Sequence, residues 1–190
     1  MLKKLALVLL AVTMVSTIAA AQGDVYSVNY YSNRNNIAGL DQFVNIINPG
    51  MQGSPMSANE GTLCADVYVF DTAQEMIECC AYPITANALL QLSVNNNLTA
   101  NPLTSVAPSA GVIKIVSSLP TGTTCDPKNP GALTPNLRSW ATHIQQPTAG
   151  TFVTTETKFE DSPISASEAS WLPQACTFVQ FLGTKKGVCQ

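Results

Sequence analysis

The sequence predicts a mainly β fold, a disulfide-stapled antiparallel β-sandwich with one C-terminal α-helix. Three observations support this fold class. Short segments in which apolar and polar residues alternate recur along the chain, with turn-forming residues between them. Six cysteines, an even number, are spread over the chain. Residues 165–182 combine a helix-capping pattern with apolar residues at helical spacing.

Residues 1–21 have the three parts of a secretory signal peptide. Lys3 and Lys4 form a basic start, residues 5–15 are an apolar run, and residues 19–21 are alanines suited to cleavage. A membrane anchor is the alternative, but the apolar run is shorter than a membrane-spanning helix requires. We therefore expect the protein to be secreted to the extracellular space or the periplasm.

The mature chain, residues 22–190, is expected to be a single domain with a core of its own. It carries 7 Lys and Arg against 12 Asp and Glu, which gives a net charge of −5. This charge disfavours nucleic acid and anionic membrane surfaces as partners. No other stretch is long and apolar enough to form a transmembrane segment. The partner is left open, with an extracellular polymer or self-association as the candidates.

Strands are predicted wherever alternation or β-branched and aromatic residues dominate between turn signals. In chain order these segments are residues 24–31, 42–47, 63–70, 75–82, 89–94, 111–118 and 151–160. Residues 137–145 fit both helical spacing and strand alternation. Because only a short loop containing proline and glycine separates them from the last strand, we interpret the two segments as a hairpin.

The strongest helix prediction covers residues 165–182. Ser165 and Glu168 form a capping box at its start, and Gly183 is a suitable C-cap. Pro173 lies inside the segment and is expected to kink or restart the helix, because proline lacks the N–H that an internal turn needs.

Residues 63–85 are predicted to form the hairpin around which the fold is organised. Cys79 and Cys80 are adjacent in its second strand, so their side chains should point to opposite faces and take different partners. A three-residue turn would place Cys64 opposite Cys80. A turn that is one residue shorter or longer would shift that pairing, so turn length decides it.

Export makes disulfides the expected state of all six cysteines. The pairing that we expect is Cys64 with Cys80, Cys79 with Cys125, and Cys176 with Cys189. It rests on proximity along the chain, and Cys125, which lies in a long loop, is the rival partner among 15 pairings. Zinc is disfavoured because the chain has one histidine and no C-x-x-C pair. No cofactor or metal is expected, although calcium needs only oxygen ligands and stays open.

His143 is the only histidine and the only basis for a hydrolase hypothesis. A Ser-His-Asp triad would have to use it, yet no G-x-S-x-G or similar motif frames a nucleophile. A half-exposed strand histidine is the favoured interpretation. Carboxylates cluster at Glu75 and Glu78 and at Glu156, Glu160 and Asp161, and Glu156 and Glu160 are expected to share a solvated strand face. A glycosidase is therefore disfavoured, and the sequence favours a protein that is not an enzyme.

Trp140 and Trp171 are the candidate ligand-binding residues. Together with several tyrosines they could form a platform on which sugar rings stack, whereas core packing is the usual role of tryptophan. Aromatic residues make up only 7% of the chain. Core packing is therefore favoured unless these rings prove to be exposed in one row.

Four segments resemble a family of uncharacterised secreted bacterial proteins. They are residues 43–50, 64–71, 78–80 and 140–143, with the sequences FVNIINPG, CADVYVFD, ECC and WATH. The resemblance covers most of the mature chain. It implies export, a bacterial source and disulfides, and it transfers no active site.

Three hypotheses for the function follow. The leading one is a secreted non-catalytic extracellular module with a structural, adhesive or surface-assembly role. The alternative is a β-sandwich module that binds carbohydrate or another ligand, which an exposed row of aromatic rings would favour. The third is a hydrolase that uses His143, which a cleft joining this residue to a nucleophile and a carboxylate would favour.

Overall fold

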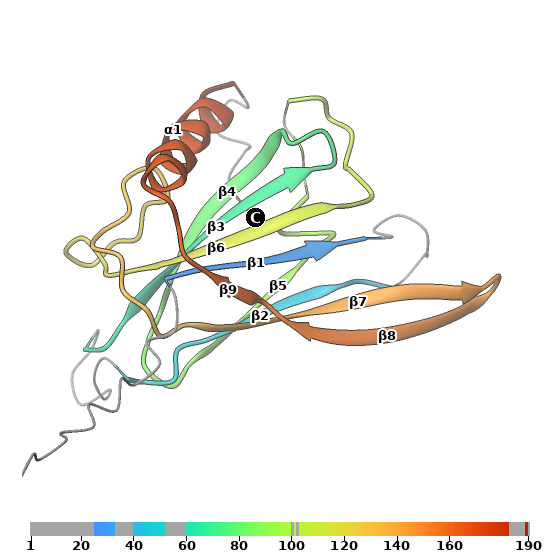
Figure 1. Ribbon diagram of the computed structural model, residues 1–190, viewed down its shortest axis with the longest axis horizontal. Helices are drawn as coiled ribbons and strands as arrows, with labels where there is room; N and C mark the ends of the chain where they lie inside the picture. The colour runs from blue at the N-terminus through green and yellow to red at the C-terminus, as the bar shows by residue number, and fades with distance from the viewer. Residues whose placement is uncertain are drawn as a thin grey trace, which may run out of the picture.

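A computed structural model of the protein describes residues 25–32, 40–51, 60–99, 101, 103–182 and 189. These residues form two antiparallel β-sheets and one α-helix (Figure 1). The predicted signal peptide and the predicted C-cap, Gly183, lie outside the described residues. No helix in the described part of the chain is long and apolar enough to cross a membrane.

The predicted fold class is confirmed: the protein is mainly β, with two antiparallel sheets. The five-stranded sheet consists, in spatial order, of β4 (Met76–Ile84), β3 (Leu63–Asp71), β6 (Gly111–Ser118), β1 (Tyr26–Tyr31) and β9 (Glu160–Ser162). The four-stranded sheet consists of β5 (Leu89–Ser93), β2 (Phe43–Ile47), β7 (Arg138–Thr148) and β8 (Thr151–Lys158). In Figure 1 the β7–β8 hairpin extends well beyond the other strands, on the side away from the helix.

The main core lies between the two sheets. Strand alternation sends every second side chain of the central strands inward, where aliphatic residues dominate. From the five-stranded sheet they include Val67, Val69, Ile113 and Ile115, and from the four-stranded sheet Val44, Ile46 and Ala141. The alternation seen in the sequence therefore marks the inner faces of both sheets.

The hairpin interpretation of residues 137–145 is confirmed, because these residues lie in β7, with His143 paired to Thr155 of β8. The predicted strand 151–160 is interrupted, however. Phe159 is buried at the point where the chain leaves one sheet for the other, and its N–H donates to the carbonyl oxygen of Ser139 at 2.9 Å.

Because of this interruption, Glu156 lies in β8 of the four-stranded sheet and Glu160 lies in β9 of the five-stranded sheet. The expectation that these two carboxylates share a strand face is therefore wrong. The short β9 pairs with the first half of β1, and the alternation pattern did not mark it as a separate strand.

The helix, α1 (Ala166–Leu182), begins where the capping pattern predicts. The hydroxyl oxygen of Ser165 accepts a hydrogen bond from the N–H of Glu168 at 3.1 Å. The Glu168 carboxylate binds Lys114 of β6 at 2.5 Å, so it is engaged with the sheet. The helix continues through Pro173 as one element, so the expected restart does not occur.

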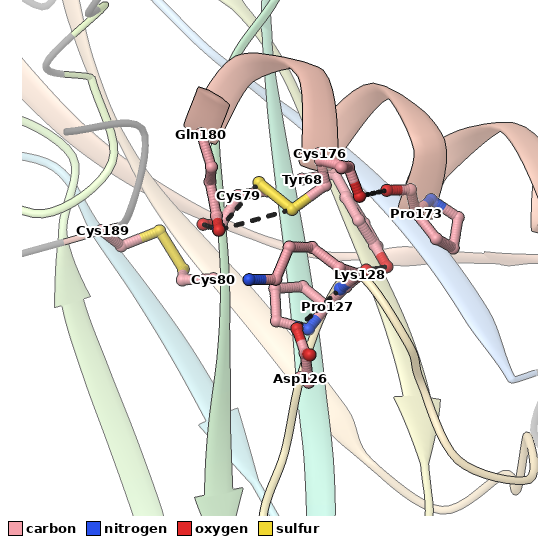
Figure 2. Close-up of a disulfide and its surroundings, with 11 residues drawn as sticks. Tyr68, Cys79, Cys80, Asp126, Pro127, Lys128, Pro173, Cys176, Gln180 and Cys189 are labelled. Atoms are coloured by element: carbon pink, nitrogen blue, oxygen red, sulfur yellow. Dashed lines mark hydrogen bonds between the residues drawn. A yellow bond between two sulfur atoms is a disulfide. The ribbon is translucent and has the colours of Figure 1, made fainter. Parts of the chain in front are cut away.

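All six cysteines form disulfides, but the predicted pairing is wrong. The bridges are Cys64–Cys125, Cys79–Cys176 and Cys80–Cys189, in place of Cys64–Cys80, Cys79–Cys125 and Cys176–Cys189. The adjacent residues Cys79 and Cys80 take different partners, as strand geometry requires. Figure 2 shows the two bridges leaving neighbouring positions of β4.

The hairpin register explains the first error. A bulge after Val69 shifts the pairing of β3 with β4, so Cys80 lies opposite Val67 and faces the core between the sheets. Cys64 alternates with the inward-facing Ala65 and therefore faces outward. Two cysteines on opposite faces of one sheet cannot form a bridge.

The position of β4 explains the second error. β4 is an edge strand, and it is bridged to two residues of the C-terminal part of the chain, Cys176 and Cys189. Cys176 in α1 meets Cys79 on the outer face, whereas Cys189 meets Cys80, which packs in the core between the sheets. Proximity along the chain therefore gave the wrong partner for both C-terminal cysteines.

Candidate functional site

The outer face of the five-stranded sheet is apolar and lies beneath a cover, which we define as α1 together with residues 119–137. Leu172 and Val179 of α1 belong to one hydrophobic cluster with Tyr68 and Val116 of the sheet. The hydroxyl of Tyr68 also donates a hydrogen bond to the carbonyl oxygen of Pro127 at 2.8 Å (Figure 2). The cover therefore adds a third layer and a second core to the sandwich.

Two disulfides attach the cover to the sheet. Cys79–Cys176 joins β4 to α1, and Cys64–Cys125 joins β3 to the loop. The side-chain amide of Gln180 lies beside the first bridge and donates to the carbonyl oxygen of Cys79 at 3.5 Å (Figure 2). Cross-links at both parts of the cover fix its position on the sheet.

Trp171 stands at the edge of the cover and is 43% exposed. Its ring stacks on Phe70 of β3, with ring centres 5.6 Å apart and planes inclined by 21°. The ammonium nitrogen of Lys114 lies 4.6 Å from the centre of the Phe70 ring and 5.9 Å from that of Trp171. The same ammonium group binds Glu168, so the indole lies against the Phe70 ring with an ion pair beside both rings.

Hollows lie on two sides of this indole. The first, of about 350 Å³, is lined by Trp171 and Phe70 together with the polar residues Asp71, Gln74, Lys114 and Glu168. The second, of about 420 Å³, is lined by Trp171 with Gln74, Glu75, Met76, Leu103, Gln174, Ala175, Phe178 and Val179. Trp171 and Gln74 line both, so the two hollows flank one tryptophan between α1 and the β3–β4 turn.

Beside its buried face, α1 carries a second apolar face that is exposed, whereas the side turned directly away from the sheet is mostly polar, with Ser170, Gln174 and Thr177. Phe178 is 60% exposed and Phe181 is 80% exposed, and Leu182 is also exposed. Phe178 and Leu182 follow Trp171 by seven and eleven positions, so these three side chains share one helical face. We call Trp171, Phe178, Phe181 and Leu182 the exposed face of α1.

The two tryptophans that the sequence nominated lie on opposite sides of the molecule. Trp140 alternates in β7 with the inward-facing Ala141, so it lies on the outer face of the four-stranded sheet. Trp171 lies over the outer face of the five-stranded sheet, beside Phe70. The structure therefore does not bring Trp140 and Trp171 together in one platform, and only Trp171 borders the hollows described above.

His143 is fully buried, so the expectation of a half-exposed strand histidine is wrong. Its Nε2 lies 2.7 Å from the hydroxyl oxygen of Thr157, and its ring stacks on Tyr30 at 4.2 Å. Its Nδ1 has no hydrogen-bond partner among the described residues. Burial lowers the pKa of His143, which favours the neutral ring. Neither of these contacts is a carboxylate, and the ring has no solvent-accessible surface to offer a substrate.

Asp66 is a buried carboxyl group on the outer face of the five-stranded sheet. Its Oδ2 lies 2.7 Å from the hydroxyl of Ser118, and its Oδ1 has no hydrogen-bond partner within the described residues. Burial raises the pKa of Asp66 to about 7, and the charge of Asp126 in the covering loop adds to this. The hydrogen bond from Ser118 acts in the opposite direction and is too weak to cancel the effect of burial.

The carboxylates that the sequence grouped are also dispersed. Glu75 is exposed in the β3–β4 turn, whereas Glu78 is buried in β4. Over the described ranges, no three His, Cys, Asp or Glu side chains are placed to hold a metal ion.

Sequence reasoning nominated Trp171 but missed Phe70, Lys114 and Glu168, which surround it. These residues come from β3, β6 and α1, and only the sheet order brings them together. Phe178 could have been found from the sequence, because its spacing from Trp171 continues one face of the predicted helix.

No family model and no curated protein matches the chain. Among solved structures, the chain is similar to the Thermotoga maritima protein described as Thermotoga maritima 1070, at 10% identity and a TM-score of 0.44. The match covers 75% of this chain and 98% of that one. A similarity this distant carries no argument about function.

Proposed function

We propose that the protein is a secreted bacterial module without catalytic activity, which serves in adhesion or surface assembly through the exposed face of α1. The observation that carries this proposal is the exposure of large aromatic side chains, Trp171, Phe178 and Phe181, on a covalently fixed helix. Large exposed apolar patches are rare on monomeric soluble proteins. Where they occur, they commonly mark interaction sites.

The fixation of α1 supports a binding role. Aromatic residues dominate the binding energy of protein interfaces, and they do so best when they are ordered before the partner arrives. Cys176 anchors the middle of the helix to β4, and Leu172 and Val179 pack on either side of it. The helix backbone that carries the aromatic side chains therefore has little conformational entropy left to lose.

The cysteine chemistry supports export. Three disulfides indicate an oxidising compartment, because cytosolic reductants keep thiols reduced. The signal-peptide pattern of residues 1–21 gives a route to such a compartment. We therefore place the mature protein outside the cytoplasm, in the extracellular space or the periplasm.

The hydrolase hypothesis has less support. A general base must reach its substrate, whereas His143 is sealed between Tyr30 and Thr157. The side chain is instead packed between strands of the two sheets, β1 and β8, through Tyr30 and Thr157.

The proposal is tested with the double variant Phe178→Ser and Phe181→Ser. We expect retention of the labelled protein on the cells and extracellular material of the producing organism to fall about tenfold or more. The melting temperature should stay unchanged, because both side chains are largely exposed. Retention is measured by co-sedimentation, and self-assembly is followed in parallel by light scattering.

The matched control is Met51→Ser with Leu89→Ser, which removes two other exposed apolar side chains near the four-stranded sheet. This control should be retained like the wild type. Equal losses in both double variants would show nonspecific hydrophobic adsorption and overturn the proposal. So would undiminished retention and assembly of the Phe178 and Phe181 variant.

A further inference from the structure

We propose that the groove formed by the two hollows beside Trp171 binds a neutral saccharide chain. This inference rests on the adhesive function proposed above and names the ligand of the same region. Its starting point is the arrangement of the two hollows, about 350 Å³ and about 420 Å³, on two sides of one half-exposed indole. A linear ligand that passes over Trp171 would fill both.

The indole is suited to stacking on a sugar ring. Phe70 covers part of it, and the remainder is open to solvent. One face of a pyranose ring carries slightly positive C–H groups, which complement the negative face of an aromatic ring. Because Phe70 and the Lys114–Glu168 ion pair already support the indole, it need not become ordered when the ligand binds.

The rim of the groove offers hydrogen bonds to hydroxyl groups. Gln74 lines both hollows and Gln174 lines the second, and a primary amide can both donate and accept. Asp71 and Glu75 add carboxylate acceptors from the β3–β4 turn. The turn is rigid, because one carboxylate oxygen of Asp71 accepts the N–H groups of Ala73 and Glu75, each at 2.9 Å.

Charge selects the class of saccharide. Asp71, Glu75 and Glu168 line the groove, and the one cation among the lining residues, Lys114, is already paired with Glu168. The groove therefore carries net negative charge, as does the whole chain. Uronic acids, sulfated sugars and nucleic acids would be repelled, whereas an uncharged saccharide loses nothing to this repulsion.

The test uses Trp171 itself as the reporter. Replacing Trp140 by Phe leaves Trp171 as the only tryptophan of the mature chain. This variant is titrated with neutral hexasaccharides of glucose, N-acetylglucosamine and mannose, and with an anionic hexamer of galacturonic acid. We expect at least one neutral series to change the Trp171 emission saturably below about 10 mM, and the anionic hexamer to give no change.

Adding Gln74→Ala should weaken the binding of the neutral ligand about tenfold or more. The matched control, Gln91→Ala, removes an exposed amide that binds Asn45 on the four-stranded sheet, and it should leave the affinity unchanged. Both variants keep the reporter, and circular dichroism verifies that they are folded.

The inference is overturned if none of the neutral hexamers gives a saturable change, if galacturonic acid binds equally well, or if both glutamine variants behave alike. A response that depends only on protein concentration would point to a second copy of the chain as the occupant and would overturn it as well. If no saccharide binds while the Phe178 and Phe181 variant still loses retention, the ligand assignment fails and the proposed function stands. If saccharide binds while that variant is fully retained, the proposed function fails and the ligand assignment stands.

Discussion

The outer face of the five-stranded sheet lies beneath the cover, whereas the outer face of the four-stranded sheet is open to solvent. The covered face carries large apolar side chains, such as Tyr68 and Phe70. The open face carries Asn45 and Gln91, which hydrogen-bond to each other across β2 and β5 at 3.0 Å, and the half-buried Trp140. The covered face is therefore the more deeply buried of the two, whereas the open face mixes polar side chains with half-buried apolar ones such as Phe43 and Ile47.

All three disulfides involve the five-stranded sheet, and the geometry of α1 explains why one of them is needed there. The helix has two apolar faces. Leu172 and Val179 lie on the buried face, and Trp171 and Phe178 lie on the exposed face. The two faces are about 100° apart around the helix axis, which is the rotation from one residue to the next. A helix with two neighbouring apolar faces could roll to bury either of them. The bridge at Cys176 fixes which face is buried, so the other can remain exposed.

The largest expected effect comes from breaking this bridge with Cys79→Ser and Cys176→Ser together. We expect the free energy of unfolding to fall by about 2–4 kcal/mol, because the bridge closes a long segment of chain. Rolling or release of α1 should also change the exposure of Trp171 to acrylamide quenching, measured in the Trp140→Phe background. Urea unfolding followed by circular dichroism gives the stability.

The comparison is sharpened by Trp140→Ala on the open face. This substitution should cost less than the loss of the bridge, about 1 kcal/mol or less, because no covering layer within the described residues depends on Trp140. If the cysteine variant were as stable as the wild type and Trp171 quenching were unchanged, packing alone would hold the cover. The Cys79–Cys176 bridge would then have no part in selecting the buried face of α1.

Asp66, on the covered side, should make the free energy of unfolding depend on pH. Its pKa is about 7 in the folded protein and near 3.8 when unfolded. The folded protein therefore holds an extra proton between these values, so this group's contribution to stability is complete below pH 4 and is lost as the pH rises to 7. We expect Asp66→Asn, which keeps the partner of Ser118 without the charge, to be more stable than the wild type at pH 8 by about 2–4 kcal/mol.

At pH 3 the gain from Asp66→Asn should nearly vanish, because the wild-type carboxyl is then mostly protonated in both states. Urea unfolding at a series of pH values measures the difference. Parallel curves for wild type and variant over the whole range would show that Asp66 is ionised in the folded protein and would refute the raised pKa. Asp66→Ala is the comparison that separates charge from the loss of the Ser118 hydrogen bond.

His143 should make the free energy of unfolding depend on pH in the opposite direction. This is the smallest of the expected effects. Burial lowers the pKa of His143 in the folded state, so the unfolded chain binds a proton first as the pH falls below about 6.5. Stability should then decrease with falling pH by at most about 1.4 kcal/mol per pH unit. In the Asp66→Asn background, where the opposing carboxyl is absent, His143→Gln should flatten the curve between pH 6.5 and pH 5. An unchanged slope would contradict the burial effect.

Strand and helix positions were largely predictable, because alternation and capping are local signals. The segment 111–118 coincides with β6, and Ser165 caps α1 as expected. The break at Phe159 was not predictable, since alternation continues through it and only the docking of β9 against β1 shows that the chain changes sheets.

The disulfide pairing could not be derived, because it depends on tertiary geometry. The bulge after Val69 moves Cys80 to the inner face, and no residue type in the sequence marks this bulge. The candidate groove could not be derived from the sequence for the same reason. Trp171 was nominated by type alone, whereas its partners Phe70 and Lys114 lie on strands that are neighbours only in the folded sheet.

The connectivity of the cysteines has a consequence for biosynthesis. Under the export proposed above, the chain would enter an oxidising compartment from its N-terminus, so Cys64, Cys79, Cys80 and Cys125 would arrive there before the C-terminal pair. Of the three native bridges, only Cys64–Cys125 can form among these four. Cys79 and Cys80 must wait for residues 176 and 189, which arrive last. A chain that ends before residue 176 therefore carries two adjacent thiols with no native partner.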